Sequence, residues 1–406
     1  MNILIINHYA GCPNLGMEYR PYYLAKEWYK QGHIVTIIGS SYSHLRNLQP
    51  SVERDLQSTN EFGIQFVWIK TESYVGSGKR IINILTFVLK LIFYRRKIVN
   101  EYCPDLVIAS STYPLDIYPA YFIAKRSNSK LCFEVHDLWP LSPMVIGGYS
   151  RFHPFILIMQ AAENFAYKYS DKVISLLGNA EEHMIKHGLS PEKFVHIPNG
   201  YDRDEFENMQ EDVPYEHLKV ISDLKNANSL LVGYAGGHAP SNTLNTLIET
   251  ARLCIKHEEI KFVFVGDGPA KAELQKKSKD LGNVYFLSSV PKKSIPKLLL
   301  LFDILYIGGV KSSLHKYGIS PNKLIDYMLA ARPVILSADV ENEIVERIKC
   351  GFTVPAEEYV EVFNAILKIH FMSKDERMQM GERGRKYALS ELDYRNLSEK
   401  FLKSIY

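Results

Sequence analysis

The chain has 406 residues, of which 46% are hydrophobic and 12% aromatic. This composition excludes a disordered protein and suits two globular domains. The formal net charge of +3 gives no general case for nucleic-acid binding. Five cysteines are scattered without a CxxC pair, which favours a reducing cytosol and argues against a structural zinc site.

The chain starts directly on a predicted strand, without the basic segment or cleavage pattern of a signal peptide, so we expect a cytoplasmic protein. The longest apolar run, residues 81–94, is shorter than the roughly 20 residues that span a bilayer and contains Asn83 and Lys90. It is therefore not predicted to cross a membrane.

Short β-branched runs alternate with helical periods along the chain, which is typical of parallel sheets covered by helices. The first set of predicted strands covers residues 2–7, 34–38, 64–69, 105–109, 130–135, 172–176 and 194–197. A helix over residues 17–31, ended by Gly32, is predicted between the first two strands. The polar stretch 203–229 is interpreted as a linker region.

The alternation restarts at Leu230, with predicted strands over residues 230–234, 261–265, 284–287, 304–307, 333–336 and 352–354. The fold class is therefore α/β, with two doubly wound domains at residues 1–205 and 206–389. Two helices, at 375–389 and 392–405, follow the last strand. We expect the segment 390–406 to pack back on the first domain.

The stretch YGISPNKLIDYMLAARPVI, which begins at Tyr317, predicts a turn, a short helix and a buried strand. Ser320, Pro321 and Asn322 supply turn and N-cap chemistry. Lys323 lies in the first helical turn, where the helix N-terminus attracts anions, so a phosphate between them would explain the lysine. An ordinary capped helix with a solvated lysine would show the same pattern.

Glycines mark two strand-to-helix loops where a backbone can approach a ligand closely. Gly16 ends the loop after the first strand, and a ligand or the turn itself explains it equally well. Gly236 and Gly237 follow the strand that begins at Leu230, and His238 can add a hydrogen-bond donor to phosphate. Neither loop has the GxGxxG or GxxxxGK[ST] pattern.

Two further candidates stand at predicted strand ends, where α/β sheets place functional side chains. Gly266 and Asp267 follow the strand 261–265, although a simple turn explains them at least as well. His136 directly follows the strand 130–135, and this position favours a functional role.

No metal site is expected. Asp202 and Asp204 match the DxD pattern by which some sugar transferases hold a metal ion, but so short a pattern arises often by chance, and here it lies in the predicted linker. HExxH and Gly-x-Ser-x-Gly patterns are absent from the sequence.

Residues 79–97 predict a helix with a broad apolar surface and basic residues at both ends. Its polar sector, about 60° wide at 100° per residue, contains Lys79, Asn83, Thr86, Lys90 and Lys97. Two interpretations remain: a helix buried between the sheet and its neighbours, or a helix that lies on a membrane surface.

Taken in order, these segments resemble the family 4 glycosyltransferases, in particular the bacterial O-antigen, capsule and exopolysaccharide subgroup. The resemblance rests on the first-strand loop, LAKEWYKQGHIVTIIG, FEVHDLWP, HIPNGYDRDEF, GYAGGH, VGDGPAKAEL, SSVPKKSIPKLL with Val290, YGISPNKLIDYMLAARPVI and GERGRKYAL. It implies the GT-B fold, with two Rossmann-like domains that bind the acceptor and the nucleotide sugar.

The resemblance also implies residue roles. His136 corresponds to the family histidine near the donor sugar, and Gly16 to the glycine loop beside the diphosphate. Asp326 occupies the second position of the family's two-glutamate motif, which implies a contact with the nucleotide ribose. The first position is Gly318, a departure from the family pattern. Lys323 is inferred to replace the family's missing diphosphate-binding arginine and lysine.

The implied activity is transfer of a hexosyl or N-acetylhexosaminyl group, most plausibly from a UDP-sugar, to a glycan acceptor with retention of configuration. No cofactor or metal is expected, and the acceptor is expected on a polyprenyl diphosphate at the cytoplasmic membrane face. A UDP-sugar 2-epimerase of similar fold and a non-catalytic subunit that binds sugar nucleotides are the alternatives.

Overall fold

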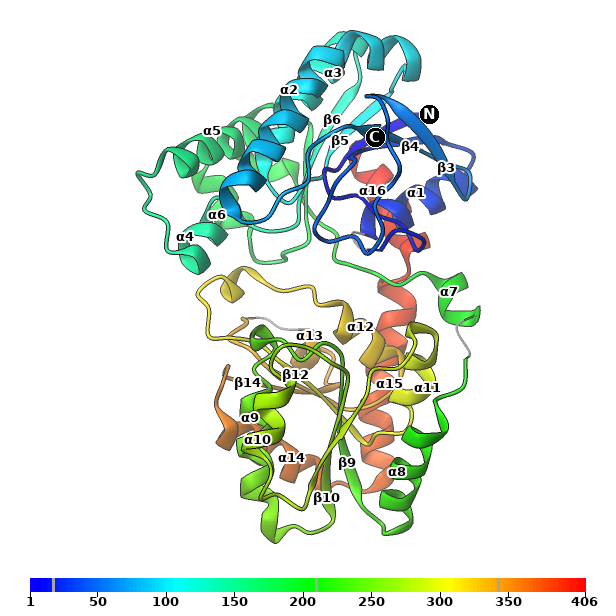
Figure 1. The fold of residues 1–406 in the computed structure, drawn as a ribbon, viewed down its shortest axis with the longest axis vertical. Helices are drawn as coiled ribbons and strands as arrows, with labels where there is room; N and C mark the ends of the chain where they lie inside the picture. The colour runs from blue at the N-terminus through cyan, green and yellow to red at the C-terminus, as the bar shows by residue number, and fades with distance from the viewer. Residues whose placement is uncertain (17–18, 209–210, 342–343) are drawn as a thin grey trace. The chain divides into compact units, whose positions relative to one another are not determined.

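The computed structural model describes residues 1–16, 19–208, 211–341 and 344–406. The chain divides into two compact units, each built on its own sheet (Figure 1). Unit 1 contains Met1–Asn199 and Tyr394–Tyr406, and unit 2 contains Gly200–Asp393. Met17 and Glu18, at the predicted start of the first helix, lie outside the described residues.

The sheet of unit 1 has the strand order β3-β4-β2-β1-β5-β6-β7-β8 and is parallel except for the β3–β4 pair. Its strands are β1 (Asn2–Ile6), β2 (Ile34–Ser40), β3 (Gln57–Glu61), β4 (Ile64–Ile69), β5 (Leu106–Ala109), β6 (Lys130–Val135), β7 (Lys172–Ser175) and β8 (Phe194–His196). The central strands are almost wholly buried because both faces are covered by helices.

The helices of unit 1 are α1 (Arg20–Lys30), α2 (Ser77–Tyr102), α3 (Ile117–Ser127), α4 (Leu141–Gly147), α5 (Pro154–Tyr169), α6 (Glu181–Lys186) and α16 (Tyr394–Ile405), with single turns at Pro114–Asp116 and Pro191–Lys193. The sequence did not predict β3. Its residues QSTNE are polar and only half-buried, because an edge strand needs no continuous apolar run.

The sheet of unit 2 has the order β11-β10-β9-β12-β13-β14, all parallel. Its strands are β9 (Leu230–Ala235), β10 (Ile260–Val265), β11 (Val284–Leu287), β12 (Ile304–Gly308), β13 (Val334–Ser337) and β14 (Gly351–Val354). Each lies within two residues of a predicted strand. Apolar runs that are buried on both faces make such strands easy to recognise.

The helices of unit 2 are α7 (Arg203–Asn208), α8 (Tyr215–Asn226), α9 (Leu244–Leu253), α10 (Lys271–Lys277), α11 (Ile295–Leu299), α12 (Asn322–Leu329), α13 (Ile344–Arg347), α14 (Tyr359–His370) and α15 (Lys374–Glu391), with single turns at Pro240–Asn242, Cys254–Lys256, Lys292–Ser294 and His315–Tyr317. The interpretation of residues 203–229 as a linker is wrong for most of its length, because α8 buries Ile221 and Leu224 in the core of unit 2.

Helix α16 packs on α1 within unit 1 (Figure 1). The indole of Trp28 donates a hydrogen bond to the Ser398 carbonyl at 3.0 Å, and its ring meets Phe401 edge-on. Tyr23 stacks on Tyr394 with ring centroids 5.2 Å apart. The last helix therefore completes the core around β1 and β2.

Helix α2 has one face buried in unit 1 and one face exposed. Two residues of the polar sector face the rest of unit 1, because Asn83 is buried against the Glu72 carbonyl and Lys90 pairs with Asp55 at 3.0 Å, whereas Lys79 and Lys97 are exposed. Ile84, Phe87 and Leu91 are also buried. The outer face is an exposed apolar stripe of Ile82, Leu85, Leu89 and Phe93, with exposed fractions of 64, 41, 63 and 75%.

Among the described residues, no helix is both long and apolar enough to cross a membrane.

Candidate functional site

The first helical turn of α12 lies against the loop that follows β9. A side chain at Gly236 would have its Cβ 2.4 Å from Cε of Lys323, so the lysine stem occupies space that only glycine leaves open. The Lys323 ammonium donates to Oδ1 of Asn242 at 3.1 Å and lies 5.4 Å from the centre of the Tyr234 ring. Partial burial lowers the pKa of Lys323 from its usual value, while Asp326 acts to raise it.

The loop after β9 is also packed against the loop after β10. A Cβ on Gly266 would lie 2.0 Å from the Gly236 carbonyl oxygen, and one on Gly268 would lie 2.6 Å from the His238 carbonyl oxygen. The His238 N–H donates to the Asp267 carbonyl at 2.8 Å. Loop-on-loop packing therefore accounts for these glycines, while Gly237 is exposed and a Cβ there would meet only the Asp267 carbonyl oxygen, at 4.0 Å.

The imidazole of His238 does not have the placement expected of a phosphate donor. It is fully buried beside Tyr234, Phe264 and Phe286, and neither ring nitrogen has a hydrogen-bond partner among the residues that the structure describes. This burial lowers its pKa. The loop is thus held by the backbone of His238, with the ring turned into the aromatic core.

Asp267 connects the loops after β10 and β11. One carboxylate oxygen accepts from Lys271 at 2.7 Å and the other from the Ser289 N–H at 3.1 Å. These hydrogen bonds, that of Lys271 first, lower the pKa of Asp267 to about 2. Val290 follows in the same loop and packs half-buried on the core of unit 2.

The N-terminus of α12 is open to an anion. Its N-cap is Pro321, which offers no side-chain hydrogen bond, and Asn322 and Lys323 are the first helical residues. Ser320 is half-buried just before the cap, and Asp326 is exposed about one turn further along the helix. Unpaired N–H groups, the helix dipole and Lys323 all favour negative charge here.

Gly318 occupies the position of the family's first glutamate, and its backbone conformation suits glycine. Gly318 has φ of 103° and ψ of 164°, a conformation that residues with side chains rarely adopt.

In unit 1, His136 belongs to a polar network at the carboxyl edge of the sheet. Its Nε2 lies 3.1 Å from the Ser110 hydroxyl and 3.3 Å from Oε2 of Glu134. Ser110 donates to the same Glu134 oxygen at 2.6 Å, and Asn7 donates to the Ser110 carbonyl at 2.6 Å. These residues come from the ends of β1, β5 and β6, so the parallel sheet brings them together.

Glu134 is buried but stays ionised. Burial acts to raise its pKa, but the Arg20 guanidinium at 3.0 Å, together with His136 and Ser110, lowers the pKa to about 2. Arg20 also donates to the carbonyls of Ile197 at 3.0 Å and Pro198 at 2.6 Å. The carboxylate that orients His136 is thus fixed by residues far apart in the sequence.

The backbone conformation and packing at residue 16 explain why it is a glycine. Its φ is 98°, and a Cβ would lie 2.8 Å from the backbone nitrogen of Asn47. The approach of this loop to a ligand stays a prediction.

In the DxD pattern, Asp202 caps α7 and accepts a hydrogen bond from the Glu205 N–H at 2.7 Å, which gives the first aspartate a structural role.

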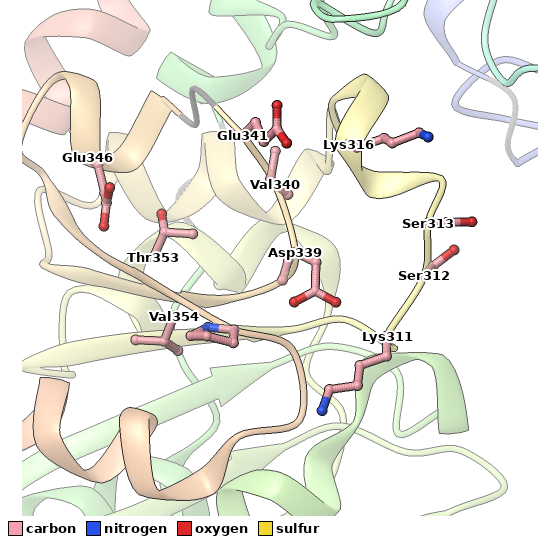
Figure 2. Close-up of a pocket in the computed structure, with 12 residues that line it drawn as sticks. Lys311, Ser312, Ser313, Lys316, Asp339, Val340, Glu341, Glu346, Thr353 and Val354 are labelled. Carbon is pink, nitrogen blue, oxygen red and sulfur yellow. The ribbon is translucent and has the colours of Figure 1, made fainter.

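One cavity among the described residues contains none of the predicted site residues. It measures about 720 Å³ and lies in unit 2, between the chain that follows β12 and the ends of β13 and β14. Figure 2 shows Lys311 and Asp339 on its walls, with Thr353 across from them. Its lining residues lie at or after the ends of three separate strands, so no single sequence motif predicts the cavity.

The structure brings Lys323, Gly236 and Gly237 together in unit 2, and places His136 in unit 1. Sequence reasoning missed the residues that hold them: Tyr234, Asn242, Ser110, Glu134 and Arg20. Glu134 carried a usable signal, since a charged residue within a buried strand needs a partner.

The two units match two family models. Residues 16–205 match Glycosyltransferase Family 4, and residues 229–370 match Glycosyl transferases group 1. A search of curated proteins found no match.

Several solved structures share the fold at low identity. HepE of Anabaena, in complex with UDP and glucose, has 17% identity and a TM-score of 0.65, with 100% of this chain and 99% of that chain covered. Sucrose-phosphate synthase of Thermosynechococcus elongatus has 16% identity and a TM-score of 0.68, with 99% and 97% covered. A trehalose-6-phosphate structure from E. coli, bound with UDP-2-fluoro glucose, has 11% identity and a TM-score of 0.74, with 99% and 98% covered.

Proposed function

The chain belongs to the family 4 glycosyltransferases, which have the GT-B fold, and from this premise we propose that it transfers a sugar from a UDP-sugar to a lipid-linked glycan, with retention of configuration. The product would serve surface polysaccharide synthesis. The proposal that the chain binds a UDP-sugar donor rests on the position of Lys323, at an uncapped helix N-terminus and directly over Gly236.

The donor's diphosphate is assigned to the space beside Lys323 and Gly237. Departure of UDP builds negative charge on the diphosphate, and the ammonium and helix N-terminus are fixed before that charge develops. Asn242 accepts one hydrogen bond from an ammonium that has three N–H groups, which leaves capacity for phosphate oxygens. UDP is the proposed nucleotide because HepE and the E. coli structure were solved with UDP compounds. Asp326 is assigned to the ribose.

His136 is assigned to the donor sugar. Glu134 and Ser110 hold its ring, with Nε2 at 3.3 Å from the carboxylate and 3.1 Å from the hydroxyl. No enzymic nucleophile is assigned, because departure and attack on one face of the sugar require none. Lys323 supplies the charge that a divalent ion would otherwise supply on the diphosphate, so transfer is proposed to need no metal.

The acceptor is proposed to lie in the membrane, with α2 resting on the anionic lipid surface. The stripe of Ile82, Leu85, Leu89 and Phe93 offers apolar side chains to the lipid. Lys79 and Arg80 lie near the start of the helix, and Arg95, Arg96 and Lys97 lie further along it, where they suit lipid phosphates; Arg80 also donates to the Tyr9 hydroxyl at 3.1 Å. The exposure of the stripe favours this interpretation over a fully buried helix.

The test measures release of UDP from a panel of UDP-sugars, with and without a polyprenyl-diphosphate glycan or a short soluble analogue. Release that depends on the acceptor is expected. UDP binding without turnover for any acceptor would instead support the non-catalytic alternative. Protection against heat by UDP-, GDP- and dTDP-sugars identifies the nucleotide, because a ligand at 100 times its Kd adds about 2.7 kcal/mol of stability.

A further inference from the structure

Helices α5 and α6 bring a carboxylate and two imidazoles together in unit 1. The residues are Glu163 on α5, His183 on α6 and His187 at the end of α6. Each offers one ligand atom, and these atoms all lie within 4.8 Å of one another. Nε2 of His183 is 3.7 Å from Oε1 of Glu163.

The carboxylate is buried and held in place. Only 2% of the Glu163 surface is exposed. The Tyr167 hydroxyl donates to Oε1 at 2.8 Å, and the Gln160 amide donates to Oε2 at 2.7 Å. Both donors are neutral, and the His183 imidazole 3.7 Å away balances the carboxylate charge only when it is protonated. A buried charge is costly without a compensating partner, and a bound cation would provide one.

The two histidines are spaced and oriented as metal ligands. They are four residues apart, which places them on one face of a helix, and their ring centroids are 4.3 Å apart. Nδ1 of His187 lies 2.8 Å from the His183 carbonyl oxygen. A carbonyl only accepts, so Nδ1 carries the proton and the Nε2 lone pair is left for a metal.

We propose that Glu163, His183 and His187 bind one zinc ion that ties α5 to α6. Two imidazoles favour zinc over magnesium or calcium, which prefer oxygen ligands. Zinc bonds of about 2.0–2.2 Å to nitrogen and oxygen require the three atoms to close in by roughly 1 Å. Three protein ligands leave a fourth position for water. The site uses no cysteine, so the scattered cysteines that argued against zinc do not bear on it.

The experiment uses the untagged full-length protein, freed of metal by a chelator and then titrated with zinc against a chromophoric indicator. One zinc per chain is expected, with a rise in Tm. Glu163→Gln and His187→Ala should each weaken binding at least tenfold and abolish the Tm rise. The control is His370→Ala, which removes a histidine that lies 3.0 Å from Glu259 in unit 2. It should change neither quantity.

Cobalt in place of zinc reports the ligand type. Nitrogen and oxygen ligands give d–d bands without a thiolate charge-transfer band, and a thiolate band would assign the ion to cysteine and overturn the proposal. Equal zinc affinity in all three variants, or no stoichiometric binding, would also overturn it. Circular dichroism checks that the variants are folded. None of these readouts depends on sugar transfer, so failure here and failure of the proposed function are separable.

Discussion

At the scale of single residues, Lys323 and Gly236 depend on each other. The lysine stem fills the place where any other residue at 236 would carry its Cβ. The sequence showed both residues but not their contact, because 87 positions of chain separate them and only the sheet brings β9 and α12 together. The burial of the His238 ring could not be predicted from the sequence either, because a glycine-rich loop predicts a turn but not the direction of a side chain.

Lys323→Ala is expected to reduce UDP-sugar turnover by about ten- to hundredfold, because a charge-assisted contact to phosphate contributes roughly 1.5–3 kcal/mol. The fold should be kept, since the side chain is only half-buried. Kinetics and Tm measure the two effects, and Lys276→Ala on the exposed face of α10 is the matched control. Wild-type turnover in Lys323→Ala would remove the lysine from the mechanism.

His136→Ala is expected to lower kcat far more than it changes the Kd for UDP, because its assigned role is at the sugar and not at the nucleotide. Turnover and UDP titration by calorimetry give the two quantities. His33→Ala, in the same unit but outside the Glu134 network and the Glu163 cluster, is the control for loss of an imidazole. A collapse of UDP affinity in His136→Ala would instead assign the residue to nucleotide binding.

The double variant Asp202→Asn/Asp204→Asn is expected to keep near wild-type turnover, both with and without added magnesium or manganese. Asparagine caps a helix about as well as aspartate, so α7 should persist. Initial rates over a metal titration provide the measurement. Loss of activity in EDTA that manganese restores in the wild type but not in the variant would show that the DxD pattern is a metal site after all.

At the scale of elements, strands were predictable where they are buried on both faces and difficult to predict where they are not. β6 and β11 match their predicted bounds, because short apolar runs stand out from their flanks. β3 and α8 were missed because a polar edge strand and a helix with few apolar residues resemble loops in composition. For α2, the sequence indicated two faces but could not show which one meets the sheet.

The exposed face of α2 carries its own prediction. Glutamine at Lys79, Arg80, Arg95, Arg96 and Lys97 should weaken cosedimentation with anionic liposomes while sparing transfer to a short soluble acceptor. Electrostatic attraction contributes about 1 kcal/mol per basic residue near such a surface, so loss of five should be readily detected. Glutamine at Lys276, Lys277 and Lys279 of unit 2 is the control. Unchanged cosedimentation of the α2 variant would exclude membrane docking by this helix.

At the scale of the whole molecule, stability should depend on pH through Glu134. Its pKa in the folded protein is about 2, below the usual value of 4.5, so its contribution is present above about pH 4.5 and is lost as the pH falls toward 2. The shift corresponds to on the order of 3 kcal/mol. Glu134→Gln should therefore be less stable at pH 7, and its unfolding free energy should fall less steeply between pH 4.5 and 2. Urea unfolding at several pH values tests this, and parallel curves for the two proteins would contradict it.

The return of α16 to unit 1 makes unit 2 an insertion between two parts of one domain. During synthesis, the face of α1 that carries Tyr23 and Trp28 has no cover until residues 394–406 have left the ribosome, after all of unit 2. Unit 2 has a continuous chain and can fold earlier. The N-terminal half is therefore expected to finish folding second, and a ribosome stalled before residue 394 should hold an unfinished unit 1 that a chaperone can still bind.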